Sequence, residues 1–393
     1  MQNLKSLASV IFIVLSLMTF LTSSAFGDAS DASVLFLRIV NDPGAVAMGN
    51  CVVNNINAQS ALYNPGAIGL FYLDKNFSFS LPNNSMWLKE VTNNLRYKTF
   101  SIGGGISLKQ LNKSFYDKFN ASLSIAYSRQ KITYGEIAVT DPYGEFLGYD
   151  YPYEKASYYT IGLGFEFYAR IGVGYTIKKI HSDLGSILLG SMGKAKAEAH
   201  DIGIIADIPF GEILPLKIPV GENKAHSINF DLTPSYAYVK ANGGDDINYS
   251  NSSQSDPLPE IKRKGYAVYG GVNLDQSSII SFRSASEHEE DLVTEDSEDI
   301  EKNGSEIGFF GIFYYRWGKY EDSYGHIDIK TSGYAINLKN IIKWFDTIGP
   351  GYDKKTERYI TDHFDFIFEY ASYNDDEDDA LSNTTFLKIS FSI

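Results

Sequence analysis

The chain has 393 residues, a formal net charge of −14 at pH 7, and many aromatic residues, including 28 Tyr and 25 Phe. The acidic balance argues against a nucleic-acid-binding protein, which needs a basic face. The single cysteine, Cys51, excludes an intramolecular disulfide, so other interactions must hold the fold together. Length and composition fit either a soluble domain or a closed membrane barrel, whose signal is alternation rather than long apolar runs.

The first 27 residues are typical of a secretory signal peptide. Lys5 is followed by an apolar run over residues 7–21, and small residues close the segment at 25–27. The apolar run is shorter than the roughly 20 residues that a membrane-spanning helix needs. We therefore expect residues 1–27 to be a signal peptide, with an anchoring helix as the alternative.

The stretch "AQSALYNPGAIGL", residues 58–70, places a structure breaker between apolar flanks. Its centre is Tyr63, Asn64, Pro65 and Gly66. Pro fixes φ, Asn hydrogen-bonds to neighbouring backbone, and Gly tolerates positive φ, so these residues predict a tight turn rather than an evident helix or strand. The apolar flanks predict that this turn is packed against other parts of the chain.

Most of the chain after residue 72 alternates between apolar positions and polar or glycine positions. In residues 159–167 the odd positions hold Tyr, Ile, Leu, Phe and Phe, and the even positions hold Thr, Gly, Gly and Glu. Such a period of two is typical of a β-strand with one apolar face. About thirteen such runs occur, at 76–82, 94–109, 119–134, 156–168, 169–182, 199–208, 225–240, 261–274, 276–288, 305–320, 324–339, 361–373 and 384–393.

The length of these runs favours a membrane barrel over a soluble β-sandwich. Runs such as 94–108 and 324–338 exceed the roughly 9–11 residues with which a barrel strand crosses a bilayer, whereas ordinary strands have about 5–6 residues. Aromatic residues such as Trp317 and Tyr370 stand towards the ends of apolar faces, where interfacial girdles lie. We predict an all-β fold, a transmembrane antiparallel β-barrel of about 14 strands, in which the last run closes the ring against the first.

The even strand number of single-chain bacterial barrels implies that one strand is missing from this count. We expect a miscounted strand between residues 340 and 362, although residues 337–349 also have the pattern of a short amphipathic helix.

Residues 36–70, "FLRIVNDPGAVAMGNCVVNNINAQSALYNPGAIGL", resemble the opening of PorV/PorQ-type outer-membrane proteins, which belong to the wider superfamily of FadL-like barrels. The likeness rests on Gly-Ala-x-Ala-Met-Gly at 44–49 and on Ser-Ala-Leu-Tyr-Asn-Pro at 60–65. Gly66 departs from the Ala of the family, and Asn50 and Cys51 depart from its glycines. Residues 316–327 and 368–393 also resemble hairpins of the family.

The resemblance implies a division of the mature chain into two parts. Residues 28–72 are expected to form a hatch inside the lumen, with Tyr63, Asn64, Pro65 and Gly66 at its turn, and residues 73–393 to form the barrel. Irregular backbone at membrane depth is tolerated only when protein encloses it, which agrees with such a hatch. The alternative is that residues 58–70 form a periplasmic loop with no gating role.

The sequence offers little support for catalysis or metal binding. The six histidines share no metal-ligand spacing, and there is no Gly-x-Ser-x-Gly motif. Gly103, Gly104 and Gly105 lie in a predicted strand, where close packing or curvature is a better explanation than phosphate binding. The acidic stretches 287–301 and 375–379, and the polar stretch 243–256, are expected to be solvated loops rather than Ca²⁺ sites. We predict no enzyme activity, no cofactor, no metal site and no nucleic-acid partner.

Two functional interpretations follow from the resemblance. In the first, the protein is a type IX secretion component that binds the secretion machinery or secreted proteins with C-terminal signal domains. In the second, it is a FadL-like transporter of hydrophobic small molecules; a structural outer-membrane protein is a third possibility. Each places the exported chain among the lipids of a Gram-negative outer membrane. Transport predicts an apolar pocket between hatch and wall, and secretion predicts an exposed apolar face towards the cell exterior.

Overall fold

The computed structural model describes most of the chain after residue 31. The described residues are 32–86, 94–111, 119–185, 187, 190–221, 226–249, 255–275, 277–294, 299–341, 364–374 and 384–393. The expected signal peptide lies outside them and stays a prediction.

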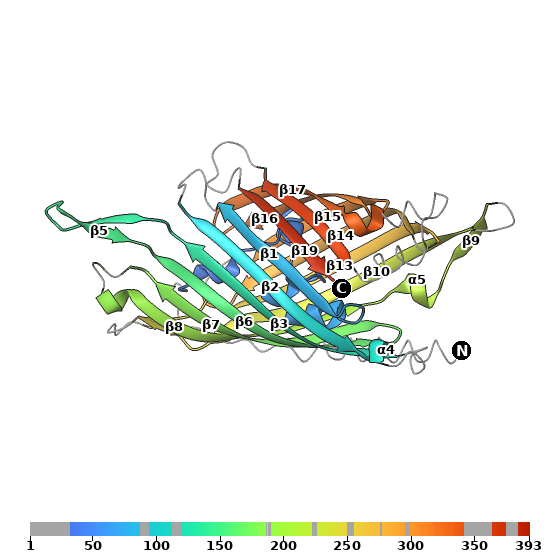
Figure 1. Ribbon diagram of the computed structural model, residues 1–393, viewed down its shortest axis with the longest axis horizontal. Helices are drawn as coiled ribbons and strands as arrows, with labels where there is room; N and C mark the ends of the chain where they lie inside the picture. The colour runs from blue at the N-terminus through green and yellow to red at the C-terminus, as the bar shows by residue number, and fades with distance from the viewer. Residues whose placement is uncertain are drawn as a thin grey trace.

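Fourteen antiparallel strands form a ring that closes on itself (Figure 1). The first and last strands pair through Ser78 with Ser392 and Ser80 with Ser390. The predicted 14-strand barrel is therefore confirmed, and a sandwich of two sheets is excluded. The strands of the ring are β1 (Phe77–Met86), β2 (Arg96–Ser107), β3 (Asn120–Thr133), β6 (Tyr153–Glu166), β7 (Arg170–Asp183), β8 (Lys194–Asp207), β10 (His226–Gly244), β13 (Ile261–Leu274), β14 (Ser277–Asp291), β15 (Ile300–Phe309), β16 (Phe313–Asp322), β17 (Ile327–Asn337), β18 (Asp365–Tyr373) and β19 (Thr385–Ser392).

The strand missing from the sequence count lies within residues 300–322, so its expected place between 340 and 362 is wrong. The single predicted run 305–320 holds parts of two strands, β15 and β16, joined by a turn at residues 310–312. Phe310 and Gly311 have φ values of 57° and 63°, as in a tight hairpin turn. The turn is apolar and three residues long, so Phe309 before it and Phe313 after it are four positions apart. Odd positions therefore point outward on both strands, and the sequence shows one uninterrupted alternation.

The alternation sets one face of every strand against the lumen and the other towards the outside. On β6, Ile161 and Leu163 are exposed on the outer face, whereas Thr160 and Gly162 are buried on the inner face. Trp317 and Tyr370 also point outward, each 40% exposed, as expected for aromatic residues of an interfacial girdle.

Short elements extend the barrel at both ends. Between β3 and β6, a hairpin of β4 (Ile137–Thr140) and β5 (Phe146–Asp150) projects from the barrel at the left of Figure 1. We call this end the hairpin end, and the opposite end, where Ile393 lies, the C-terminal end. The remaining short elements are α4 (Leu108–Leu111), η4 (Gly190–Gly193), α5 (Phe210–Ile213), β9 (Lys217–Val220), β11 (Ile247–Tyr249) and β12 (Ser255–Asp256).

The helices of the structure are short. Residues 338–341 are helical, as the pattern of 337–349 predicts, and residues 342–363 lie outside the described part of the chain. Among the described residues, no helix is long and apolar enough to cross a membrane.

Residues 32–75, which we call the inner segment, run through the ring from one end to the other (Figure 1, blue). At the hairpin end, the Ser33 amide donates to the carbonyl of Pro257 over 3.0 Å; at the C-terminal end, the Asn76 amide donates to the carbonyl of Ile393 over 2.6 Å. The segment contains η1 (Leu35–Arg38), α2 (Pro43–Val46), η2 (Ser60–Leu62) and α3 (Pro65–Phe71). Nearly all its side chains from residue 34 to 73 are buried, so the core of the molecule lies between this segment and the wall.

Candidate functional site

The inner segment contains the same local motif twice, Asx-Pro-Gly-Ala at residues 42–45 and 64–67. The Asn64 side chain accepts a hydrogen bond from the Gly66 amide over 2.9 Å, and Asp42 accepts one from the Gly44 amide over 3.1 Å. Each is the N-cap of a helix whose first residue is proline, a position that needs no amide hydrogen. The predicted turn at 63–66 is therefore the start of helix α3, and the expectation of no regular structure over 58–70 is wrong.

Helix α3 lies directly against the backbone of β6, β7 and β8. A Cβ atom at Gly66 would stand 2.8 Å from the carbonyl oxygen of Gly203, and one at Gly69 would stand 2.3 Å from that of Leu163. Gly66 has no positive φ, so its role is to allow this close approach. The wall also has glycines at this contact. A Cβ atom at Gly172 would stand 2.2 Å from the carbonyl oxygen of Gly66, and one at Gly174 would stand 2.2 Å from that of Pro65.

The other residues of the predicted turn hold the inner segment to itself. The Tyr63 hydroxyl accepts a hydrogen bond from the Asn41 amide over 2.9 Å, and the Asn64 amide group donates to the Val53 carbonyl over 2.7 Å. Burial raises the pKa of Tyr63, with Asp42 adding to the shift, so its hydroxyl stays protonated and neutral. Tyr63, Asn64, Pro65 and Gly66 are thus brought together at the interface of segment and wall.

Helix α2 is tied to the opposite wall by a buried ion pair. The ammonium group of Lys388 on β19 contacts the carboxylate of Asp42 and lies 2.6 Å from Glu369 on β18. Glu369 also pairs with Arg316 of β16 over 2.6 Å. Lys388 and Asp42 are almost completely buried, so each charge depends on the other for compensation.

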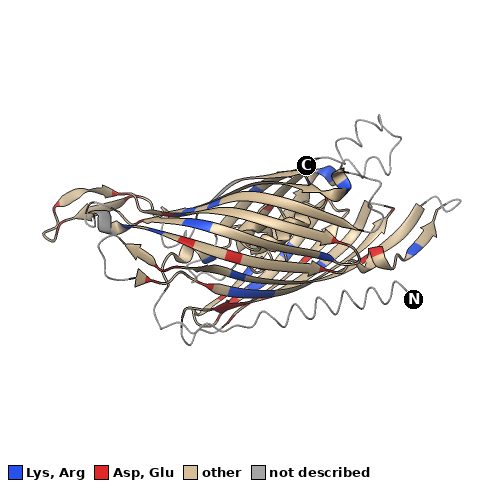
Figure 2. Cartoon of the chain, turned by 90° about the horizontal axis from the view of Figure 1, so that it is seen from below, with Lys and Arg blue, Asp and Glu red and all other residues tan. Residues whose placement is uncertain are grey.

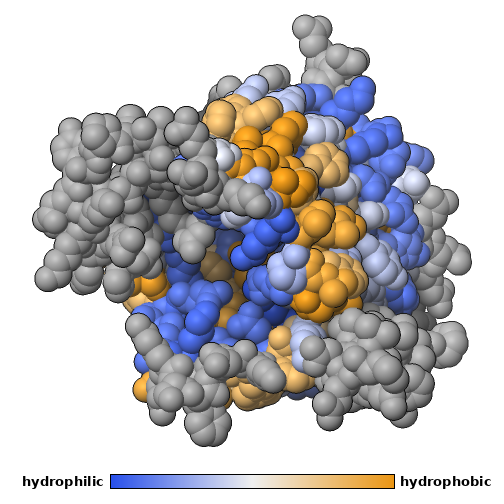
Figure 3. All heavy atoms as spheres, turned by 90° about the vertical axis from the view of Figure 1, so that its right-hand side faces the viewer, coloured by the Kyte–Doolittle hydropathy of each residue, from blue (hydrophilic) through white to orange (hydrophobic). Residues whose placement is uncertain are grey.

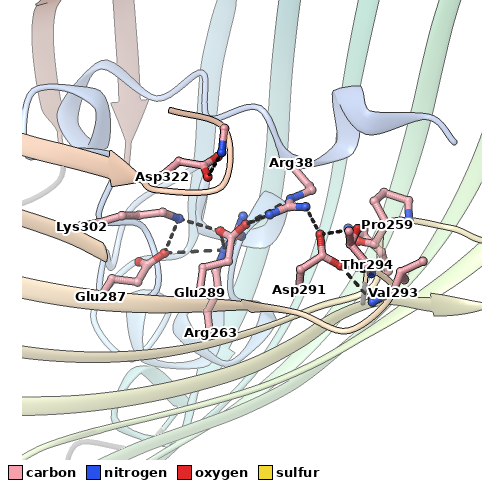
Figure 4. A network of polar contacts seen from close by, with 12 residues as sticks. Arg38, Pro259, Arg263, Glu287, Glu289, Asp291, Val293, Thr294, Lys302 and Asp322 are labelled. Carbon is pink, nitrogen blue, oxygen red and sulfur yellow. Dashed lines mark hydrogen bonds and ion pairs between the residues drawn. The ribbon is translucent and has the colours of Figure 1, made fainter. Parts of the chain in front are cut away.

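A second ionic cluster holds η1 and the following loop to β13, β14 and β15 (Figure 4). The Arg38 guanidinium lies 2.9 Å from Glu289 and 2.5 Å from Asp291. Glu287 accepts hydrogen bonds from the amides of Val52 and Val53 over 2.6 and 2.8 Å.

The same cluster is closed by two cations of the wall. Lys302 lies 2.9 Å from Glu287 and 2.7 Å from Glu289, and Arg263 lies 2.8 Å from Glu289. Three cations, Arg38, Arg263 and Lys302, thus balance the three carboxylates. The expectation that residues 287–301 form a solvated loop is wrong in part, because Glu287 and Glu289 are inward positions of a strand whose carboxylates neutralise lumenal cations.

Cys51 packs on the wall between these anchors. It shares a buried cluster with Met48, Ala267 and Ala285, and its thiol lies 3.8 Å from the carbonyl of Ala285. Burial raises the pKa of the Cys51 thiol, and the nearby Glu287 carboxylate raises it further. The thiol is therefore protonated and shielded at neutral pH.

Two cavities with mixed polar and apolar linings lie between the inner segment and the wall. One, of about 260 Å³ towards the hairpin end, is lined by Arg38, Asn50, Glu289 and Lys302 among others. The other, of about 410 Å³ towards the C-terminal end, includes Asp207, Asp231 and Arg283. Figure 3 shows hydrophilic residues around a recess at that end.

An apolar hollow lies on the outer face of β2, β3 and β6. It has a volume of about 880 Å³ and is lined by Ile106, Leu123, Ile125 and Ile161 over the backbone of Gly103–Gly105. Directly behind these glycines stands Tyr72 at the end of α3: a Cβ at Gly103 would be 2.4 Å from its hydroxyl, and one at Gly105 2.5 Å from its Cβ. Only a backbone layer separates the apolar groove from the inner segment here.

Tyr72 is held in place behind the groove. Its hydroxyl lies 2.5 Å from that of Ser78, and burial raises its pKa to about 12. The close packing predicted for Gly103 and Gly105 is thus present, and its partner is this ring.

No protein-family model matches the chain, and no curated protein sequence matches it. Among solved structures, the chain is similar to the toluene transporter TodX of Pseudomonas putida, at 9% identity and a TM-score of 0.40, over 94% of this chain and 99% of that one. It is similar to the toluene transporter TbuX of Ralstonia pickettii, at 10% identity and a TM-score of 0.38, over 89% and 96%. The CymD monoaromatic hydrocarbon channel is similar at 9% identity and a TM-score of 0.35, over 92% and 98%.

Sequence reasoning singled out residues 63–66 as a turn but not as the start of a helix, and it missed the capped helix at residues 42–46. The Asp42-Pro43-Gly44-Ala45 stretch repeats the motif at 64–67, and this repeat was the available signal. Lys388 and Glu287 carried no signal, because their partners lie 346 and 235 residues away in the chain. Within the described residues, no group of three His, Cys, Asp or Glu side chains is placed to hold a metal ion.

Proposed function

We propose that this protein is an outer-membrane transporter for small hydrophobic molecules, with the inner segment as a hatch that closes the lumen. The apolar groove over Gly103–Gly105, backed by Tyr72, is the observation that carries the proposal. A hydrophobic molecule in the groove is separated from the inner segment only by glycine backbone. A displacement of Tyr72 and of the strands around these glycines would join groove and lumen.

A transporter built this way releases or receives its cargo through the wall as well as through the lumen. The lumenal cavities are small and lined by charged groups, which disfavour an apolar molecule that crosses the whole barrel in water-filled space. The groove offers apolar contact at membrane depth. The apolar hollow that we assign to transport therefore lies outside the wall, opposite the inner segment, and the cavity between hatch and wall at the hairpin end is smaller and mixed in character.

The hatch role of the inner segment agrees with the width of the barrel. A barrel of more than about eight strands has a lumen that its own side chains do not fill. The two capped helices and the two ionic clusters fill and tie that space, with Tyr63, Asn64, Pro65 and Gly66 at the contact with β7 and β8. The type IX secretion role rests on the sequence resemblance of residues 36–70, and we rank it below transport. We expect no enzymatic activity.

The test is the entry of a hydrophobic dye into cells. A Gram-negative host that expresses the protein is exposed to N-phenyl-1-naphthylamine, which fluoresces once it reaches lipid. We expect faster entry than in cells without the protein. Gly104→Leu, which fills the groove from an outward position, should remove most of the protein-dependent rate.

Gly270→Leu is the matched control, because Gly270 is an outward glycine on β13, away from the groove, whose Cβ position has only an ordinary contact, 3.9 Å from the Asp231 carbonyl oxygen. It should retain wild-type entry. Equal rates with and without the protein, or equal loss in both variants, would refute the transport proposal.

A further inference from the structure

A row of basic side chains crosses five neighbouring strands on the outer face near the hairpin end. Direct register partners join Lys98 to Lys131, Lys131 to Lys155, Lys155 to His181, and His181 to Lys196. Strands lie about 4.8 Å apart, and like charges directly opposite each other destabilise a sheet. We call these five residues the basic row; Figure 2 shows Lys and Arg segments on the strands of this part of the wall.

The surroundings of the basic row add positive charge and few carboxylates. Arg129 and Lys179 lie two positions from the row on one side, and Arg96 and Lys194 lie two positions from it on the other. Among the outward described positions of these five strands at this level, the acidic ones are Asp183, which lies 3.4 Å from Lys194, and Glu198.

Two lysines of the row have an aromatic contact in place of a carboxylate. The ammonium groups of Lys131 and Lys155 both lie over the ring of Tyr153, 4.6 and 5.5 Å from its centroid. Within the described part of the chain, none of Lys98, Lys131, Lys155 or Lys196 has a carboxylate within 4 Å. Among the described residues, a chain of net charge −14 thus gathers lysines without carboxylate partners on one side of the wall.

The opposite side of the barrel is built differently at the same level. There Lys240 lies 2.7 Å from Glu260, Lys262 contacts Glu290, and Lys319 lies 3.1 Å from Asp328. These three cations have carboxylate partners, whereas the outward Lys264 of β13 and Lys330 of β17 have none within 4 Å among the described residues. The basic row is therefore distinguished by its length, because four lysines and one histidine stand in direct register across five strands.

The position of the row relates it to the membrane interface. Tyr127 and Tyr159 point outward with ring centroids 5.4 Å apart, and Lys131 lies four residues beyond Tyr127 on the same strand face. At about 3.3 Å per residue this is roughly 13 Å along a tilted strand. Outward aromatic rings mark the interface, so the lysines stand at the level of lipid headgroups.

We propose that the basic row binds phosphate groups of anionic lipid headgroups in the leaflet at the hairpin end. Lysine binds phosphate as a point charge, and clusters of Lys and Arg near a membrane surface recognise anionic lipids. The row spans four strand intervals, roughly 19 Å at the usual spacing, so a headgroup with two phosphates matches it better than a single phosphate. Bound phosphate also relieves the repulsion between the opposed lysines.

The test compares lipid binding by native mass spectrometry of the folded, detergent-solubilised protein. The probe is lipid A, a diphosphorylated glycolipid, with phosphatidylethanolamine as the reference lipid. We expect preferential lipid A binding by the wild type, and about a hundredfold weaker binding by Lys98→Gln/Lys131→Gln/Lys155→Gln, given the usual contribution of three lysines at an anionic surface. The matched control, Lys240→Gln/Lys262→Gln/Lys319→Gln, removes three paired cations and should bind within about twofold of wild type.

A stability measurement keeps the proposal testable if the triple variant expresses poorly. In neutral detergent, Lys131→Gln should melt at the same or a higher temperature than wild type, because it removes like-charge repulsion. With lipid A present, the order should reverse. No preference for lipid A in the wild type, equal losses in both triple variants, or displacement of lipid A by millimolar inorganic phosphate would each overturn a lipid-headgroup site.

Discussion

Asp42 and Asn64 occupy equivalent positions at the start of two short helices that press on opposite walls of the barrel. Each caps its helix through a hydrogen bond from a glycine amide, but Asp42 pairs with Lys388, whereas Asn64 faces Gly203 of β8. One anchor is therefore ionic and the other depends on close backbone packing. The two should respond to different substitutions.

The packing anchor is tested by Asn64→Ala with Pro65→Ala. The cap is lost, which costs about 1 kcal/mol, and the Asn64 hydrogen bond to Val53 is lost with it. We expect the double variant to retain the heat-modifiable gel mobility of a closed barrel, because strand pairing holds the ring. Its single-channel conductance in planar bilayers should exceed that of wild type. Wild-type conductance would count against a hatch role for this turn, and an unfolded barrel would make the turn structural.

The ionic anchor is tested by Lys388→Met. This change leaves the Asp42 carboxylate buried beside Glu369 with no cation of its own, a situation that costs about 3–5 kcal/mol. We expect a protease to cleave the inner segment faster in the variant than in the wild type. Amino-terminal sequencing of the fragments locates the cleavage sites.

Asp42→Asn serves as the control in a double-mutant cycle with Lys388→Met. Removing both charges should restore much of the protection, so the double variant should resist the protease better than Lys388→Met alone. Additive effects of the two substitutions would mean that the ion pair does not hold α2 to the wall.

Gly69→Ala separates helix propensity from contact with the wall. Alanine makes a helix more stable than glycine does by roughly 0.5–1 kcal/mol. Its Cβ atom, however, would stand 2.3 Å from the Leu163 carbonyl oxygen, and relieving this clash requires a shift of the helix or strand backbone. We expect net loss of docking, seen as a lower melting temperature. Gly270→Ala, whose Cβ has only an ordinary contact at 3.9 Å, should melt like wild type. A stabilised Gly69→Ala would show that α3 stands away from β6.

Cys51 gives a pH-dependent signal of docking. An exposed thiol ionises at a pKa of about 8.5, and a maleimide reacts with its thiolate. Burial raises the pKa of Cys51, so its labelling rate should stay low through pH 9 while the inner segment is docked. Above about pH 8.5 the undocked thiol ionises while the docked thiol remains protonated. Docking of the inner segment therefore becomes less favourable as the pH rises above about 8.5. Rapid labelling at pH 7 would show that the segment is not held against β14.

The strands of this protein are readable from its sequence because each needs only a local alternation. The pair β15 and β16 is the exception. The turn at Phe310 and Gly311 is apolar and keeps the outward positions in phase, so the two strands look like one continuous strand in the sequence. The inner segment is harder, because helices of four to seven residues contain too few turns for a helical period. Proline, which marks a break in sequence, here begins both α2 and α3.

The ionic clusters are beyond sequence reasoning for a different reason. Lys388 is an ordinary inward position of the last strand, and only barrel closure brings it to Asp42, 346 residues earlier. Glu289 likewise meets Arg38 through the folded inner segment. The chemistry of each residue is visible in the sequence, but its partner is set by tertiary structure.

A reversible lock of the inner segment tests most directly whether it gates transport. Ala285→Cys places a second thiol beside Cys51, within the same buried cluster, and Cys51→Ser with Ala285→Cys is the control that cannot form the bond. We expect oxidation of the first variant to abolish protein-dependent entry of N-phenyl-1-naphthylamine, reduction to restore it, and the control to be unaffected by either treatment. Undiminished entry through a protein shown on gels to be cross-linked would contradict the account.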